Sequence, residues 1–120
     1  MTVLPKIRVL ENSEVLGARF VAEYLTGKIG VVGFGPTETA AKGDLAAQAA
    51  WYAPDDPKYL AVVANDPDVL RAAVTAAKRY AVKRRIGADV HPEREDLLRS
   101  AKQWDRAADR LQTLLDKVTV

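Results

Sequence analysis

Residues 92–120 read PEREDLLRSAKQWDRAADRLQTLLDKVTV, and this stretch decides the fold. Its apolar side chains recur at gaps that alternate between four and three residues, and nearly everything between them is charged or polar. The resulting heptad stripe consists of Leu97, Ala101, Trp104, Ala108, Leu111, Leu115 and Val118. A helix with so narrow an apolar seam must bury it against another helix, either in its own chain or in a second copy of it.

The segment before this helix supplies a partner for the seam. Asp66 and Pro67 form a double start signal, because aspartate caps a helix and proline suits its first position. A helix is therefore predicted from Pro67 to Ile86, ended by Gly87. Its broad apolar face consists of Val69, Leu70, Ala73, Val74, Ala77, Tyr80 and Ala81. Only about five residues separate this helix from Pro92, which is expected to open the last one, so the two helices should form an antiparallel hairpin.

The first 36 residues are predicted to form a strand, a helix and a second strand. Residues 6–10 alternate between polar and apolar side chains, which is typical of a half-buried strand. Residues 13–26 start with cap-forming side chains, and Gly27 follows as a stop signal. The apolar face of that predicted helix consists of Leu16, Phe20, Val21, Tyr24 and Leu25. Residues 28–36 combine β-branched residues with three glycines, which favours a short, bent strand.

The next segment allows two interpretations. Thr37 can cap an alanine-rich helix from Glu38 to Tyr52, in which Gly43 costs about 1 kcal/mol relative to alanine. The other interpretation starts the helix at Asp44 and leaves 33–43 as a loop.

A short helix from Pro57 to about Ala64 completes the predicted elements, because Asp56 and Pro57 repeat the double start signal. The fold class that follows is mainly α (α+β), with a C-terminal antiparallel helical hairpin and a short N-terminal strand–helix–strand segment. We expect a single domain over 1–120, with the strand–helix–strand and a glycine-rich loop in 1–43 and a helical body in 44–120.

Composition restricts the chemistry. The 120 residues include no cysteine, which excludes a disulfide framework, a thiolate nucleophile and cysteine-ligated metal centres. His91 is the single histidine, so the sequence offers few residues for a zinc site and only one candidate base for a Ser-His-Asp triad. We expect a capping or surface role for it. No apolar run approaches the ~18 residues of a membrane-spanning helix, and no signal-peptide pattern is present. We therefore expect a cytoplasmic protein without a membrane partner, a cofactor or a bound metal.

A local concentration of positive charge is the first candidate binding feature. Five cations fall within eight residues, while the whole chain carries a net charge of only +2. The cluster consists of Lys78, Arg79, Lys83, Arg84 and Arg85. These side chains either complement the dipole at a solvated helix end or contact nucleic acid or an acidic partner.

Aromatic residues offer a second candidate. Trp51 and Tyr52 precede a proline-rich loop and could form an exposed anchor for a partner or a buried lid over the hairpin. Trp104 lies on the heptad seam between two small alanines, so we expect it in the core. The paired aspartates at 55–56 and at 66 and 68 are explained by helix capping without a metal.

The glycine-rich segment suggests a third reading. The run Gly33-Phe34-Gly35-Pro36-Thr37, taken with the strand–helix–strand order of residues 6–36, resembles the phosphate-binding turn of the aminosugar-phosphate deaminase and phosphogluconolactonase family. The resemblance covers about a quarter of the chain and implies an enzyme that binds a sugar phosphate through residues 29–39. A structural bend or an inter-subunit loop is the alternative.

The second half of the chain resembles the small head–tail connector (head-completion) proteins of tailed bacteriophages, over about residues 66–120. The positions that carry this resemblance are Asp66 to Arg71, Ala76 to Tyr80, Arg94, Leu97, Ala101, Trp104, Leu111, Leu114, Leu115 and the tail 117–120. The resemblance implies a homo-oligomeric ring seated between portal and tail, with DNA passing through its lumen.

These observations favour a structural virion assembly protein over an enzyme. The resemblance implies localisation in the virion after assembly in the host cytoplasm, and it implies three kinds of partner: further copies of the chain, the portal and tail-side proteins, and DNA. The alternative is a small nucleic-acid-binding or regulatory interaction module that uses the basic cluster at 78–85. A sugar-phosphate-binding enzyme is the third hypothesis.

Overall fold

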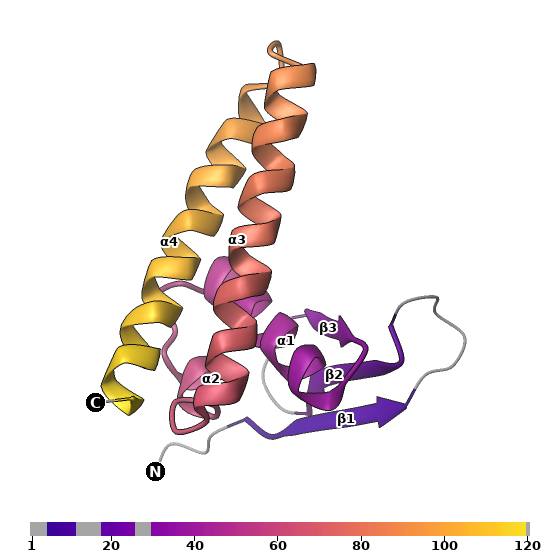
Figure 1. Ribbon diagram of the computed structural model, residues 1–120, viewed down its shortest axis with the longest axis vertical. Helices are drawn as coiled ribbons and strands as arrows, with labels where there is room; N and C mark the ends of the chain where they lie inside the picture. Colours follow the sequence, from indigo (N-terminus) through magenta and orange to yellow (C-terminus); the bar gives the residue numbers. More distant parts are fainter. Residues whose placement is uncertain (1–4, 12–17, 26–29, 120) are drawn as a thin grey trace.

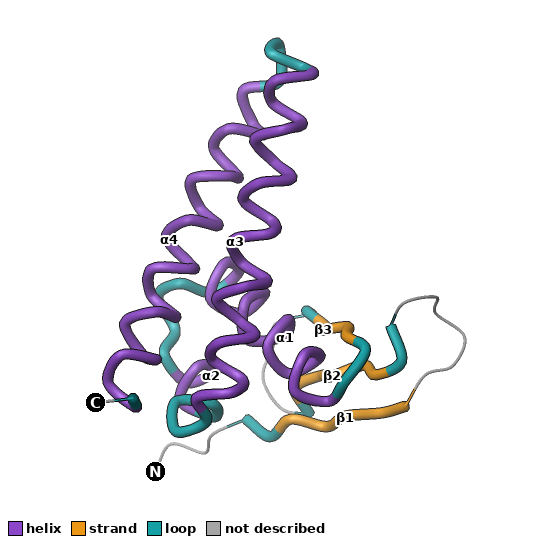
Figure 2. Tube along the Cα trace, viewed as in Figure 1, coloured by secondary structure: helices purple, strands orange, loops and turns teal. Residues whose placement is uncertain are grey.

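The computed structural model describes residues 5–11, 18–25 and 30–119. A three-stranded sheet and one helix packed on it form a compact base, from which a long helical hairpin projects (Figure 1). In chain order the elements are β1 (Ile7–Glu11), β2 (Phe20–Tyr24), β3 (Val32–Gly35), α1 (Glu38–Tyr52), α2 (Lys58–Ala61), α3 (Pro67–Val90) and α4 (Glu95–Val118). Figure 2 shows that the strands lie at one end of the molecule, beside the lower half of the hairpin. The fold is mainly α (α+β), as predicted.

The antiparallel hairpin of α3 and α4 is confirmed. On α4, the heptad seam is buried from Ala101 to Leu115, and Trp104 is only 2% exposed. On α3, the predicted apolar face is buried except for Tyr80, which is partly buried. Leu70 and Leu111 are fully buried in the core that α1 and α2 share with the hairpin. The hairpin therefore satisfies most of its narrow seam within one chain.

The predicted ends of the two long helices are wrong by a turn. Helix α3 continues through Gly87 to Val90, and the His91 N–H donates to the Gly87 carbonyl oxygen at 2.8 Å. A Cβ at Gly87 would lie 3.2 Å from a methyl group of Leu97, so this glycine allows α4 to approach closely and does not end α3. Helix α4 begins at Glu95, because Pro92 lies in the turn between the helices.

The strand–helix–strand prediction for the N-terminal segment is also wrong. Residues 20–24, expected in a helix over 13–26, form β2, which pairs antiparallel with β1 on one side and β3 on the other. Phe20, Ala22 and Tyr24 are spaced for one face of a strand, and Ala22 is fully buried against α1. Residues 12–17 and 26–29, which include the predicted helix start and Gly27, lie outside the described residues.

Helix α1 follows the first of its two interpretations. It begins at Glu38, and the Thr37 hydroxyl oxygen accepts a hydrogen bond from the Ala40 N–H at 3.0 Å. The alternative start at Asp44 is wrong, because the cap at Thr37 sets the start of α1. The single domain over 1–120, with its parts 1–43 and 44–120, stays a prediction. The short helix α2 ends at Ala61, and turns follow it up to the cap of α3.

Glycines let three layers pack closely. A Cβ at Gly33 or Gly35 would collide with the backbone of α1, and one at Gly43 would collide with Ala72 of α3. The sheet and α3 can therefore both lie close to α1. Gly43 weakens an isolated helix, but it allows the close contact between α1 and α3.

Candidate nucleic-acid interface on the helical hairpin

A buried carboxylate ties the sheet to the hairpin. Asp44 of α1 is 8% exposed, and its Oδ2 accepts a hydrogen bond from the Phe34 N–H of β3 at 2.8 Å. Its Oδ1 accepts one from the Tyr80 hydroxyl of α3 at 2.6 Å. The Gln48 side-chain amide donates to that hydroxyl at 3.2 Å. Burial, followed by the Asp44 hydrogen bond, raises the pKa of Tyr80 to about 12.

An aromatic stack continues from Tyr80 through the core. The Tyr80 ring lies 4.4 Å from the Trp104 ring, and Trp51 stacks on Trp104 at 5.2 Å between ring centroids with an angle of 7° between the planes. Trp51 is half-buried and packs on the hairpin, which agrees with the lid interpretation, and its role as a partner anchor stays a prediction. Tyr52 is 57% exposed, and its role as a partner anchor stays a prediction.

The glycine-rich turn is occupied by internal packing. Gly33 and Gly35 face α1, the Phe34 N–H is bonded to Asp44, and the Ala40 N–H is bonded to Thr37. Within the glycine-rich segment 29–39, the Phe34 amide thus already has an acceptor and is not free for a phosphate. The structural-bend interpretation accounts for the glycines.

The predicted basic cluster does not form one surface. Successive residues of an α-helix point about 100° apart, so Lys83, Arg84 and Arg85 project from α3 in three directions. Arg85 is also bound to Asp105 of α4 in a bidentate ion pair, which lowers the pKa of that carboxyl group. The role of the cluster as a nucleic-acid contact stays a prediction, and its geometry favours separate, solvated cations.

A different set of cations lines up along the outer face of α4. Their spacing of three, four, four and seven residues keeps them within an arc of about 80° on the helix surface. We call this set the α4 cationic stripe; it consists of Arg99, Lys102, Arg106, Arg110 and Lys117. From the first to the last, the stripe extends about 27 Å along the helix axis. It lies on the side of α4 opposite the buried seam.

The charges of the stripe are available for an external partner. None of its five side chains forms an ion pair with another residue in the described ranges. Four are exposed, while Arg110 is partly buried. Arg106 and Arg110 border a hollow of about 310 Å³ beside Trp51 and Pro54, and Arg110 and Lys117 border another of about 420 Å³ beside α2.

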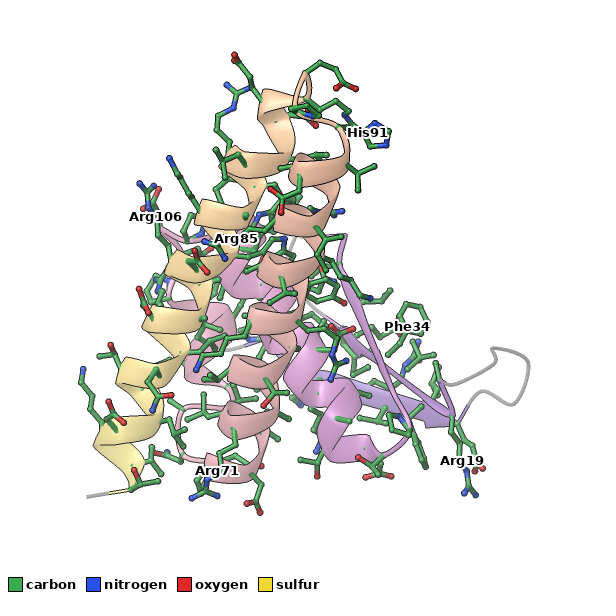
Figure 3. The ribbon with its side chains drawn as sticks, turned by 45° about the horizontal axis from the view of Figure 1, so that its top comes forward. Arg19, Phe34, Arg71, Arg85, His91 and Arg106 are labelled. Atoms are coloured by element: carbon green, nitrogen blue, oxygen red, sulfur yellow. The ribbon has the colours of Figure 1, made fainter. Side chains whose placement is uncertain are left out.

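Figure 3 shows Arg106 and Phe34 on opposite sides of the hairpin. The stripe is therefore separate from the sheet and from the glycine-rich turn.

The α4 cationic stripe is not among the binding residues predicted from the sequence, although its helical spacing is visible there. The cluster at 78–85 is recognised by cations that are close together in sequence. The α4 cationic stripe is recognised only by the helical periodicity of the polar face of α4. The same periodicity was used for the apolar face of that helix alone.

The remaining candidates have structural roles. His91 lies in the turn of the hairpin, with its Nδ1 3.3 Å from Glu93, and both side chains are exposed. Asp66 accepts a hydrogen bond from the Val69 N–H at 3.2 Å, which confirms the capping interpretation for this residue. Asp56 accepts one from the Lys58 N–H at 3.2 Å, but the N-cap position of α2 is occupied by Pro57. Within the described part of the chain, no group of three or more histidine or carboxylate side chains could hold a metal ion.

The chain matches no protein-family model, no curated protein and no solved structure. Among the helices that the structure describes, none is both long enough and apolar enough to cross a membrane.

Proposed function

We propose that this chain is a structural, non-enzymatic subunit that binds the backbone of double-stranded DNA through the α4 cationic stripe. The observation that carries the proposal is the alignment on one helix face of five cations that form no ion pair with any residue that the structure describes. Such a face releases condensed counterions when it contacts phosphates, which gives affinity without sequence specificity.

Double-stranded DNA fits the stripe better than a single strand does. Proteins that bind single strands without sequence preference combine cations with exposed aromatic rings on which bases stack. The aromatic residue of α4, Trp104, is buried on the opposite side of the helix. The residues of α4 thus offer charge without an exposed aromatic ring, and the neighbouring Trp51 is half-buried in its stack on Trp104. Charge of this kind suits a regular phosphate backbone.

The finer proposal is a head–tail connector of tailed bacteriophages. In that role the chain forms a ring with copies of itself, seated in the virion between portal and tail-side proteins, with the α4 stripes facing DNA in the lumen. The resemblance of residues 66–120 to that family supports this role, as does the position of Arg106 on the side of the hairpin opposite Phe34 of the sheet. A regulatory DNA-binding module would use the same stripe without a ring.

The DNA contact is tested by fluorescence anisotropy with labelled duplex and single-stranded DNA of equal length. We expect Arg106→Glu combined with Arg110→Glu to weaken duplex binding by on the order of tenfold or more. The matched control is Lys78→Glu with Lys83→Glu, which changes the net charge equally outside the stripe and should have a smaller effect. Equal losses of duplex affinity in both double variants would mean that net charge, not the stripe, determines affinity. A larger loss of affinity in the control would indicate that the cluster at 78–85 is the interface.

A further inference from the structure

An apolar row crosses the outer face of the sheet. Leu10, Val21 and Phe34 are directly opposite one another in the register of β1, β2 and β3. Gly33, Gly35 and Ala22 face α1. Because side chains alternate between the two faces of a strand, Leu10, Val21 and Phe34 lie on the face that points away from α1. Leu10 is 47% exposed and Phe34 42%. We call these three residues the outer sheet row.

A second apolar surface lies on the projecting half of α3. Val82, Ile86 and Val90 recur every four residues and therefore share one side of the helix. Their exposed fractions are 53%, 58% and 67%, which is unusual for three aligned aliphatic side chains of one helix. We call them the α3 apolar stripe. They lie outside the seam with α4, which buries Ala77 and Ala81 instead.

The two surfaces are complementary in kind but do not meet within one chain. A helix with an apolar stripe can pack on a sheet face that exposes an apolar row. The Arg8–Glu23 ion pair lies on the same face of the sheet, beside that row. Among the described elements, α3 packs against α1 and α4 and against no strand. No described helix of the same chain covers the outer sheet row.

The surface area of the chain matches this requirement. Its accessible surface is 7560 Å² for a mass of 13.1 kDa. A compact monomer of that mass exposes about 6,400 Å², and each partner in a standard interface contributes about 800 Å². The excess of roughly 1,200 Å² is larger than the area that one partner contributes to a standard interface.

We propose that copies of this chain associate head to tail, with the α3 apolar stripe of one copy packed on the outer sheet row of the next. Because the contact joins two different surfaces, it is heterologous and generates a ring if the rotation closes. This inference rests on the proposed assembly role and deepens it, but it does not depend on DNA binding, which uses α4.

The test uses two variants, each of which damages one surface: Ile86→Glu on the stripe and Phe34→Glu on the row. Mass is measured by light scattering after size-exclusion chromatography, and circular dichroism verifies the fold. We expect the wild-type chain to form an oligomer and each variant alone to be a monomer of 13.1 kDa. An equimolar mixture should form a dimer and nothing larger, because one intact stripe and one intact row remain to pair.

Three results would overturn the inference. If Phe34→Glu keeps the wild-type mass while Ile86→Glu is monomeric, the stripe pairs with itself. If neither variant changes the mass of the oligomer, the contact lies elsewhere and only the ring proposal survives. If the wild-type chain is monomeric, both the contact and the ring are wrong, whereas DNA binding by α4 is judged separately by the anisotropy measurement.

Matched variants keep the test decisive. Leu98→Glu, which places the same charge on a leucine 47% exposed and outside both surfaces, should leave the oligomer intact. Where Ile86→Glu or Phe34→Glu fails to fold, Val90→Glu and Leu10→Glu replace them on the same two surfaces.

Discussion

Replacement of Tyr80 by phenylalanine tests how the hairpin is fixed to the sheet. The change removes the hydroxyl group that donates to Asp44 at 2.6 Å, while the ring can keep its stack on Trp104. Asp44 is 8% exposed, so water cannot fully replace the lost donor. A hydrogen bond to a charged group contributes about 1.5–3 kcal/mol. We therefore expect the free energy of unfolding to fall by about 2 kcal/mol.

Thermal and urea denaturation measure this loss. For a domain of this size, about 2 kcal/mol corresponds to a decrease in Tm of roughly 8 °C. The control is Tyr52→Phe, which removes the hydroxyl of a residue that is 57% exposed and should change stability by less than about 0.5 kcal/mol. A loss below about 0.5 kcal/mol for Tyr80→Phe would refute the anchoring role of the Asp44 network.

The pH dependence provides a second check on the same variant. The pKa of Tyr80 is raised from 10.0 to about 12 in the folded chain, so the neutral phenol is favoured by folding. The stabilisation from this group is complete below pH 10 and is lost as the pH rises toward 12. The stability difference between wild type and Tyr80→Phe should therefore narrow over that range, and a constant difference would contradict the pKa assignment.

Three further predictions concern the core and the hairpin. Trp104→Ala removes the central ring of the aromatic stack and should cost about 3–5 kcal/mol in urea denaturation; a cost below about 1 kcal/mol would place this ring outside the core. Gly43→Leu should destabilise the chain by about 1–3 kcal/mol because a side chain there collides with α3, whereas Gly30→Ala, which meets open space, should not; equal effects would contradict the close packing. Arg85→Gln should leave Tm unchanged near pH 7, because the ion pair with Asp105 is exposed. In an NMR titration of this variant, the pKa of Asp105 should rise toward its ordinary value. An unchanged pKa of Asp105 would show that the ion pair does not form in solution.

The hairpin could be predicted from sequence because the apolar periodicity that indicates it extends over many residues. The seam of α4 keeps one period from Leu97 to Val118, and no strand pattern competes with it. The segment around Phe20 and Tyr24 is short, and these two residues satisfy a helical spacing of four as well as a strand spacing of two. Pairing with β1 and β3 decides between the two periods, and such contacts cannot be read from local sequence.

The site features depended on tertiary structure to different degrees. The hydrogen bond between Asp44 and Tyr80 joins residues 36 positions apart, and no local pattern announces it. The half-burial of Trp51 depends on α4 passing over the end of α1, although the lid interpretation had allowed for it. The α4 cationic stripe, by contrast, follows from helix geometry alone and was within reach of the sequence.

The salt dependence of duplex DNA binding tests the central claim most directly. Five phosphate contacts predict a slope of about −4.5 in a plot of log K against log salt concentration, because each contact contributes about −0.9. The combined variant Arg106→Glu and Arg110→Glu should reduce the magnitude of that slope by about two. A wild-type slope shallower than about −1, or a steep slope that this variant leaves unchanged, would contradict the assignment of the α4 stripe as the DNA-binding surface.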